Sequence, residues 1–267
     1  MLYNHNGTYC DNVSLDPINR SFLYGDGFFE SMRLFNGNIF NRKYHVKRIL
    51  DSLSVMHLSL EISVEELIAQ VEELSKKNKL ELGSTARLTI FRNEGGLYTP
   101  TSTNAKFLIS NKSHSHNSFL LDEGISLGIC QNYTKSAQPL SYLKSTSALT
   151  YVMASIEKQS QGKDELLLLN QCSRIVEATN ANVLIVKDEK VMTPPLTDGG
   201  VSGTMRSLLM EHFLMEEKSL TTADLKAADE IALCNCYGIR WVTDFDGLNH
   251  YVAKKSKEMV SLLNSLI

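Results

Sequence analysis

The chain is poor in cysteine, the residue that is abundant in disulfide-rich and zinc-binding domains. Its 267 residues include five cysteines, and also only five prolines and one tryptophan. Cys10, Cys130, Cys172, Cys234 and Cys236 are odd in number and scattered, which favours reduced, mostly buried thiols over a disulfide framework. Cys234 and Cys236 are too closely spaced for a zinc knuckle. His114 and His116 lie in the polar stretch SHSHNS, which is typical of a linker. We therefore predict no metal site.

The chain also lacks an excess of one charge and a long apolar run. It carries 27 Lys and Arg against 30 Asp and Glu, a formal net charge of -3, so its electrostatics do not favour nucleic acid or an anionic membrane as a partner. No apolar run approaches the roughly 20 residues that span a bilayer. The opening MLYNHNGTYCDN lacks the charged-then-apolar pattern of a secretory signal. We expect a cytoplasmic protein that acts on neither nucleic acid nor membrane.

What the chain does contain is enough apolar residue for a sizeable core. It is 43% hydrophobic and 21% charged, which is an ordinary globular composition, and its length allows one large or two modest domains at roughly 100–200 residues each. The first part mixes strand and helix patterns. A hairpin turns at Asn36-Gly37, a helix lies within residues 41–58, and Ser63 and Glu66 form the capping box of a second helix. Two strands, TARLTIFRN and AKFLIS, follow.

A polar segment with little periodicity, residues 111–124, is the predicted domain boundary. We place an N-terminal α/β domain at 1–114 and a second domain at 115–267. The second part reads as a strand, a helix ending at Gly162, a meander of strands, an amphipathic helix with Met205 and Phe213 on its apolar stripe, two strands and a last helix.

One carboxylate lies where a charge is costly. In SRIVEATNANVLIV, residues 173–186, two apolar runs rich in β-branched residues flank a short polar stretch, and Glu177 ends the first run. A carboxylate buried without compensation costs several kcal/mol. Glu177 is therefore either a surface group on a turn or the partner of a ring nitrogen. In the second case it keeps that nitrogen protonated, so that the ring drains electrons from a carbanion.

Two further features have both a plain and a chemical interpretation. Lys144, in QPLSYLKSTSALTY, lies between an irregular segment and an amphipathic helix. Such a lysine is commonly a surface group, but at a partly buried boundary it can act as a Schiff-base nucleophile. In DGGVSGTMRSLLMEH, glycines lead into a helix whose first N–H groups have no internal acceptor, which is either a simple cap or an anion site. Gly203, Thr204 and Met205 would donate there, and Arg48 is either a surface arginine or a grip on the same phosphate.

Taken together, these stretches resemble the fold-type IV pyridoxal-phosphate enzymes, which comprise the class IV aminotransferases (branched-chain and D-amino-acid) and aminodeoxychorismate lyase. The match runs from about Tyr24 to Val242. In chain order it includes YGDGFFESMRLFNG, HVKRIL, RLTIFRNEGG, LKSTSALTY, RIVEATNANVLIV, TPPLTDGGVSGTMR and DEIALCN. Its most specific parts are the lysine, the EAxxxN strand pair and the segment from TPP to GTMR.

The resemblance implies a role for each matching residue. Lys144 corresponds to the lysine that holds pyridoxal 5′-phosphate and shuttles a proton, and Glu177 corresponds to the carboxylate on the pyridine nitrogen. The residues that would bind the phosphate or close its pocket are Arg48, Thr204, Met205, Asn235 and Cys236. The resemblance also implies an α+β fold of two domains, a barrel-like sheet in the second, a cofactor cleft between them, and a homodimer whose partner contributes to the active site.

Several positions depart from the aminotransferases. Leu97 stands where the D-amino-acid enzymes have an arginine, and Phe29 where they have a tyrosine. Leu149 replaces a tyrosine of the branched-chain enzymes, and Cys234-Asn235-Cys236 replaces their Gly-Thr-Ala loop. The Cys-Asn pair and the short chain favour the lyase. Candidate contacts for the substrate are Phe29, Arg33, Arg92, Tyr98 and Lys135.

Three functions follow from the resemblance. The leading hypothesis is a lyase of folate biosynthesis that converts 4-amino-4-deoxychorismate to p-aminobenzoate and pyruvate. The alternative is an amino-acid aminotransferase that uses a 2-keto acid acceptor. The third is a binding protein on a retired enzyme scaffold, which the presence of both Lys144 and Glu177 argues against.

Overall fold

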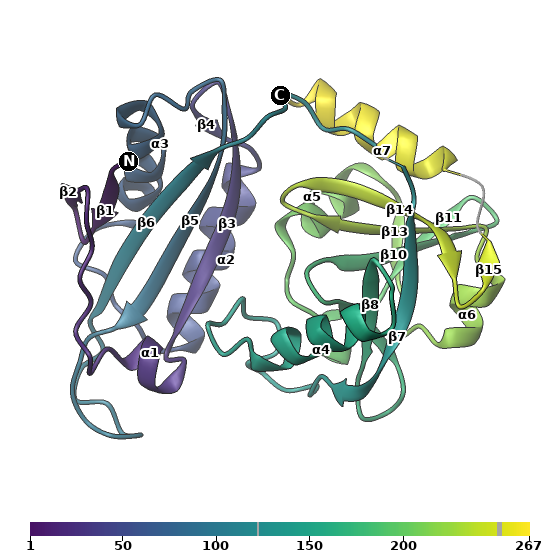
Figure 1. Ribbon diagram of the computed structural model, residues 1–267, viewed down its shortest axis with the longest axis horizontal. Helices are drawn as coiled ribbons and strands as arrows, with labels where there is room; N and C mark the ends of the chain where they lie inside the picture. The colour runs from purple at the N-terminus through teal and green to yellow at the C-terminus, as the bar shows by residue number, and fades with distance from the viewer. Residues whose placement is uncertain (122, 250–252) are drawn as a thin grey trace. The chain divides into compact units, whose positions relative to one another are not determined.

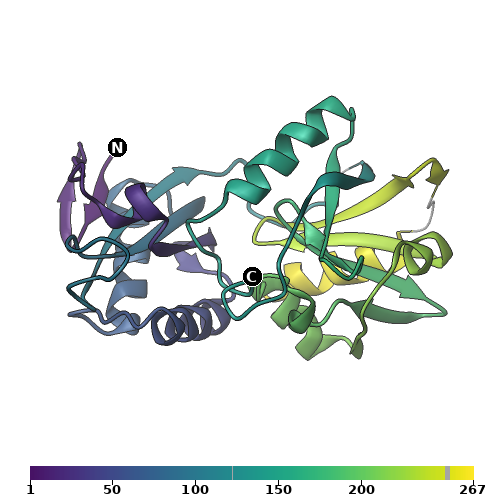
Figure 2. The ribbon, with the colours of Figure 1, turned by 90° about the horizontal axis from the view of Figure 1, so that it is seen from below.

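The computed structural model describes residues 1–121, 123–249 and 253–267. Contacts divide them into two compact units, one of Met1–Asn117 with Leu143–Ser147 and one of Ser118–Tyr142 with Ala148–Ile267 (Figures 1 and 2). Helices and two sheets make up these units, which confirms the α+β class. The boundary at 114/115 stays a prediction, and residue 122 of its polar segment lies outside the described residues. Within the described residues, no helix has the length and apolar character needed to cross a membrane.

The first unit is an antiparallel sheet with two long helices packed against it (Figure 1). The sheet has the strand order β2-β1-β6-β5-β3-β4. Asn36 and Gly37, both with positive φ, form the predicted tight turn between β3 and β4. The strands are β1 (Tyr3–His5), β2 (Thr8–Cys10), β3 (Gly27–Phe35), β4 (Asn38–Ile39), β5 (Gly83–Arg92) and β6 (Ala105–Ser113), and the helices are α1 (Arg20–Tyr24), α2 (Arg42–Val55) and α3 (Val64–Lys77).

The core of this unit follows from the helical period of α3 and the alternation along β5 and β6. Ser63 caps α3 in the predicted capping box with Glu66. The helix buries its apolar stripe in one cluster with inward-facing strand residues, because positions three and four apart share one helix face. The fully buried members of this cluster include Leu67, Ile68, Val71, Leu74, Leu88, Ile90 and Ile109.

The second unit is built on a larger mixed sheet of order β12-β11-β10-β13-β14-β7-β8-β9, with β15 paired to β14. A bridge from Ile175 to Leu220 connects β9 with the segment that follows β12, so the sheet curls into a barrel-like form. The strands are β7 (Ile125–Thr134), β8 (Glu165–Leu169), β9 (Ile175–Ala178), β10 (Asn182–Lys187), β11 (Lys190–Thr193), β12 (Met215–Glu217), β13 (Glu230–Asn235), β14 (Gly238–Phe245) and β15 (Leu248–Asn249).

Helices cover parts of this sheet. α4 packs on β7 and β8, α5 on β13, and α7 on β13 and β14 (Figure 1). Phe213, expected on the helical stripe with Met205, is instead the C-cap residue of α5, because that helix ends at His212. The helices are α4 (Leu149–Ser160), α5 (Thr204–His212), α6 (Thr222–Ala227) and α7 (Lys254–Ser265), with a short 3₁₀ turn at Leu196–Asp198.

The segment 143–147 joins the first unit through the start of β3. Phe29 donates its N–H to the Lys144 carbonyl at 2.9 Å, and Thr146 donates to the Gly27 carbonyl at 3.0 Å. Gly25 has φ +66, and a Cβ there would stand 2.2 Å from Ser147 Oγ. Gly25, the first glycine of the GDG stretch, is therefore needed both for its backbone conformation and for the close approach of the segment that carries Lys144.

We predict that Gly25→Ala destabilises the protein more than Gly162→Ala. Gly162 has a similar φ of +63 but no atom within 4 Å of a Cβ, so it reports the backbone strain alone, roughly 1 kcal/mol. Gly25→Ala adds a steric clash that costs about 1–3 kcal/mol more. Urea unfolding of the two variants measures the difference, and equal losses would contradict the close-approach role.

Candidate active site

Glu177 is a buried carboxylate that receives hydrogen bonds on both oxygens. It lies in β9, opposite Leu168 of β8, and is 3% exposed. Lys135 and Tyr151 donate to Oε1, Tyr151 at 2.6 Å. The Val201 N–H donates to Oε2 at 2.9 Å, and Asn182 Nδ2 approaches the same oxygen at 3.4 Å. The interpretation of Glu177 as a surface group is therefore wrong, and its burial is compensated by donors from separate segments.

Local structure explains how these donors converge. Lys135 directly follows β7, which runs parallel to β8, and its N–H donates to the Leu169 carbonyl at 2.8 Å. Tyr151 lies in the first turn of α4. Burial raises the pKa of Tyr151, and the charge of Glu177 and the hydrogen bond to it raise that pKa further. Tyr151 is thus held as a neutral donor to an acceptor that carries the negative charge.

Residues 199–203, with the sequence GGVSG and here called the glycine segment, connect Glu177 to the start of α5. Asn182 Nδ2 donates to the Val201 carbonyl at 2.9 Å, while the N–H of the same valine donates to Glu177. A Cβ at Gly203 would stand 1.8 Å from Asn182 Oδ1. Residue 203 must therefore lack a side chain for this segment to lie against β10, so the glycines fix the start of α5 relative to the carboxylate.

The N-terminus of α5 has the features of an anion site. Gly203 is its N-cap residue and, as a glycine, has no side chain that could cap the first turn. Thr204 and Met205, the first two helical residues, are 5% and 2% exposed. The N–H groups of the first turn and the helix dipole together favour a negative group at this position.

Asn235 and Cys236 lie at the same end of the sheet. Cys234 of β13 is in register with Asn182 of β10, which places the following residues beside the start of β10. Asn235 Nδ2 donates to the Asn180 carbonyl at 3.2 Å, and its Oδ1 accepts the Tyr237 N–H at 2.8 Å. The second unit thus gathers Glu177, the start of α5 and the 235–236 loop. This arrangement suits a ligand with a cationic ring nitrogen and an anionic group.

Lys144 lies in the first unit against an aromatic ring. It is half-buried, and its Nζ stands 4.7 Å from the centroid of the Phe29 ring. The guanidinium of Arg87, an exposed residue of β5, lies 3.6 Å from the same centroid. Two cations therefore share the Phe29 ring. Arg87 could not be recognised from the sequence, because only the pairing of β5 with β3 brings it to this ring.

Arg48 is buried in a charged network rather than solvated on the helix surface. It donates to Glu30 through Nε at 2.7 Å and Nη2 at 2.6 Å, and His45 Nδ1 lies 2.5 Å from the same carboxylate. Burial by itself raises the pKa of Glu30, but the charge of Arg48 and the hydrogen bond and charge of His45 outweigh it and lower that pKa to about 2. The network fixes the guanidinium of Arg48 in a bidentate geometry.

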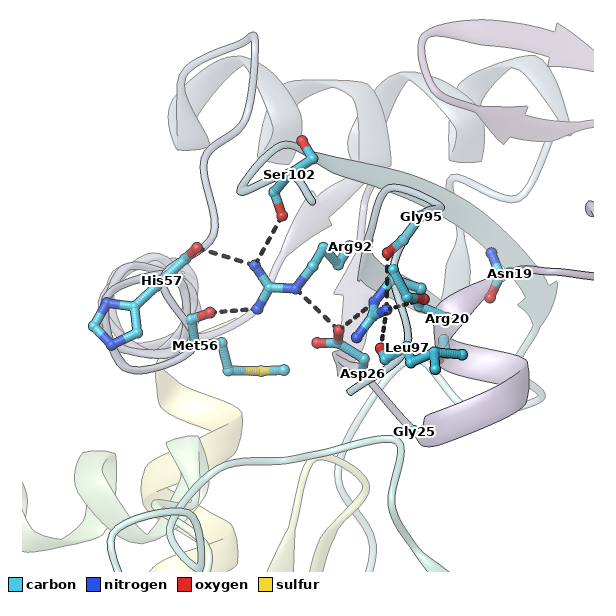
Figure 3. A network of polar contacts seen from close by, with 12 residues as sticks. Asn19, Arg20, Gly25, Asp26, Met56, His57, Arg92, Gly95, Leu97 and Ser102 are labelled. Carbon is cyan, nitrogen blue, oxygen red and sulfur yellow. Dashed lines mark hydrogen bonds and ion pairs between the residues drawn. The ribbon is translucent and has the colours of Figure 1, made fainter. Parts of the chain in front are cut away.

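Arg92, predicted as a substrate contact, has a carboxylate and three backbone carbonyls as partners within the first unit. Its Nε donates to Asp26 Oδ2 at 2.9 Å, and the rest of the guanidinium bonds the carbonyls of Met56, His57 and Ser102 (Figure 3). Arg20 donates to the same Asp26 oxygen at 2.8 Å. It also bonds three successive carbonyls, those of Gly95, Gly96 and Leu97. Two arginines on one carboxylate therefore hold the loop 93–104.

The other predicted substrate contacts have different surroundings. Arg33 is 2% exposed and donates to the His116 carbonyl, and its guanidinium lies over the Phe35 ring. Tyr98 is 89% exposed and its ring lies beside that of Tyr24. Lys135, predicted to bind a substrate carboxylate, forms an ion pair with Glu177. The sequence shows the cation but not the carboxylate that it faces.

Several residues of these networks were not singled out from the sequence, among them Tyr151, Asn182, Glu30, His45, Arg20 and Asp26. A signal existed for Asn182, which is the last residue of the EAxxxN pattern. Among the described residues, no group of three His, Cys, Asp or Glu side chains gathers to hold a metal ion.

Similar sequences and structures all point to one protein family. The model of the amino-transferase class IV family matches residues 27–245. The chain is 30% identical over 224 residues to the aminodeoxychorismate lyase of Vibrio harveyi, covering 81% of each. It is 25% identical over 227 residues to the branched-chain-amino-acid aminotransferase of Pseudomonas aeruginosa, covering 80% of this chain and 73% of the relative. The crystal structure of 4-amino-4-deoxychorismate lyase from P. aeruginosa matches with a TM-score of 0.83 and 26% identity, covering 95% of this chain and 96% of that one.

The Asp26 cluster makes a stability prediction. Asp26→Asn leaves two buried guanidinium groups without their anion, so we expect a loss on the order of 3 kcal/mol and faster chymotrypsin cleavage at exposed Tyr98. Asp51→Asn, which removes the anion of an exposed pair with Lys47, is the matched control and costs less than about 1 kcal/mol. Urea unfolding and limited proteolysis measure both, and similar losses in the two variants would contradict a structural role for Asp26.

Proposed function

The chain belongs to the amino-transferase class IV family, and we propose that it is a pyridoxal 5′-phosphate-dependent lyase that converts 4-amino-4-deoxychorismate to p-aminobenzoate and pyruvate. The observation that carries the chemistry is the buried Glu177 carboxylate, tied through Val201 to the glycine segment that opens α5. The reaction is favoured by the similarity to the lyase of Vibrio harveyi and by the Cys-Asn pair at 234–235, which departs from the Gly-Thr-Ala loop of the branched-chain enzymes.

The residues present fit this cofactor. A protonated pyridine nitrogen suits Glu177, which is buried and accepts hydrogen bonds, and a phosphate suits the start of α5, where the N-cap residue is a glycine. The close approach at Gly203 shows that the segment between them is shaped without side-chain bulk. When bound, pyridoxal phosphate supplies an aldehyde that joins an amine and a ring that withdraws electrons from the neighbouring carbon.

Each protein group then has a defined task. Lys144 would provide the amine that attaches the cofactor, and the freed amine would take up the proton from the substrate ring carbon. Glu177 would keep a proton on the pyridine nitrogen. The N–H groups of Thr204 and Met205 would bind the phosphate, with Arg48 as a further cation. The bond from the substrate ring to the ether oxygen would break with its electron pair on oxygen, the released three-carbon enol would take up a proton on carbon to become pyruvate, and the remaining ring would be aromatic.

Arg87 is the cation we assign to a substrate carboxylate, in place of Arg92 and Lys135. It is exposed, and it shares the Phe29 ring with Lys144, the residue that handles the proton. A planar guanidinium can bind a carboxylate through two parallel hydrogen bonds.

The second candidate function is an amino-acid aminotransferase, favoured by the similarity to the branched-chain enzyme of P. aeruginosa. An aminotransferase would use the same cofactor-binding residues and would differ in the residues that bind the substrate. Adding D- and L-amino acids to the purified protein and recording the absorption spectrum separates the two, because an aminotransferase converts the cofactor to its amine form.

The lyase proposal predicts pyruvate release from 4-amino-4-deoxychorismate without any keto-acid acceptor. Lys144→Ala is expected to abolish release, since it removes both the attachment point and the proton carrier. Lys47→Ala changes an exposed lysine on α2 and should leave the rate unchanged. A coupled pyruvate assay measures all three proteins. Absence of release from the unaltered protein, with amino-acid-dependent spectral conversion, would replace the lyase by the aminotransferase.

The assignment of Arg87 predicts a selective effect on substrate binding. Arg87→Gln should raise KM by roughly 10–100-fold, the value of a charge-assisted hydrogen bond of about 1.5–3 kcal/mol, with a smaller change in kcat. Arg87→Lys should restore part of the affinity. Arg174→Gln changes an exposed arginine of the second unit and is the control. An unchanged KM in Arg87→Gln would refute the assignment.

A further inference from the structure

We propose that Lys135 is a positioning residue that keeps Glu177 ionised and oriented before the cofactor binds, and that afterwards shares this carboxylate with the ring nitrogen. The inference deepens the proposed function and rests on it for the identity of the ring. Its structural basis is the contact of the Lys135 ammonium with Glu177 Oε1, within the second unit.

The contacts of Glu177 are divided between its two oxygens. Oε1 receives the charged donor, Lys135, together with the Tyr151 hydroxyl, and Lys135 also donates to that hydroxyl. Oε2 receives only neutral donors, the Val201 N–H and the Asn182 amide. One oxygen therefore carries the ion pair, while the other is joined to the segment that leads into α5.

The surroundings leave Lys135 as the source of charge balance. Lys135 is 9% exposed and Glu177 3% exposed, so water screens the pair weakly. Among the described residues, the titratable or charged side chains in hydrogen-bond contact with Glu177 are Lys135, from the end of β7, and Tyr151, from α4. Val201 and Asn182, from the glycine segment and β10, contribute uncharged donors. Without Lys135, no cation among the described residues would be in hydrogen-bond contact with the buried carboxylate, which would take up a proton more readily.

This arrangement has a consequence for the cofactor. A ring that arrives with a protonated nitrogen needs an ionised carboxylate, because a protonated Glu177 would have to release its proton first. Lys135 thus keeps the site ready to bind over a wider pH range. Once the ring is bound, two cations compete for one anion, so Glu177 holds the ring proton less strongly than it would without Lys135.

The first test is the pH dependence of cofactor affinity. Apoprotein is titrated with pyridoxal 5′-phosphate between about pH 5.5 and 8, and the Kd of each variant is divided by that of the unaltered protein, which cancels the titration of phosphate and of Lys144. For Lys135→Met we expect this ratio to rise as the pH falls, by up to tenfold per pH unit, because a buried carboxylate that has lost its cation binds a proton more readily. Lys135→Arg, which keeps the charge, should restore a flat ratio.

Tyr151→Phe is the matched control, because it removes the other donor to Oε1 without removing a charge. Its Kd ratio is expected to be independent of pH even if its affinity is lower. A flat ratio for Lys135→Met would overturn the proposal, since a purely structural lysine would lower affinity equally at all pH values.

A second measurement requires no cofactor. If Lys135 and Glu177 balance each other, Lys135→Met lowers the thermal stability of the apoprotein, and the double variant Lys135→Met/Glu177→Gln regains most of it. The same comparison decides the case in which Lys135→Met does not fold, since the double variant should then fold. Additive losses, or a double variant that also fails to fold, would overturn the proposal. Unaltered apoprotein that binds no pyridoxal phosphate would contradict the proposed function instead, while the stability comparison still tests the pair.

Discussion

The buried charge of Glu177 is the constraint on which the second unit depends. A carboxylate at this depth must be compensated, and its donors come from four separate segments: the residue after β7, the first turn of α4, the start of β10 and the glycine segment before α5. Satisfying one side chain therefore fixes the relative positions of these segments. The same contacts hold the Glu177 carboxylate at a fixed position relative to the N-terminus of α5, which suits an anion. The hydrogen bonds that compensate the buried charge therefore also arrange the groups that the proposed chemistry needs.

In the first unit, buried charges are compensated by ion pairs between carboxylates and arginines. Glu30 fixes Arg48 with the help of His45, and Asp26 joins Arg20 and Arg92, whose remaining donors hold the backbone of the loop 93–104. The guanidinium groups of Arg20 and Arg92 are buried among a carboxylate and backbone carbonyls, so they serve architecture. Arg87 differs because it is exposed and lies against the ring that also contacts Lys144. Burial and partners, rather than residue type, separate the structural cations from the one assigned to substrate.

Long periodic elements were predictable from the sequence, and partners were not. The Asn36-Gly37 hairpin, the capped helix α3 and the strands of the meander were anticipated, because apolar periodicity and turn residues are local signals. Short elements such as β1, α1, β12 and α6 have too few residues to show a period. For the site, Glu177 was recognisable as an acid in an apolar strand. The partners of Lys135 and Arg92 were not predictable, because Glu177 and Asp26 stand far along the chain from them and the sequence displays a charge without its counter-charge.

The proton on the cofactor's ring nitrogen is the most direct test of the role given to Glu177. Nitrogen-15 NMR of protein loaded with ring-labelled pyridoxal phosphate reports whether that nitrogen carries a proton. We expect a protonated nitrogen in the unaltered protein at a pH where the free cofactor has lost that proton, and a neutral nitrogen in Glu177→Gln. A neutral nitrogen in the unaltered protein, or a proton that survives the substitution, would contradict the role of this carboxylate.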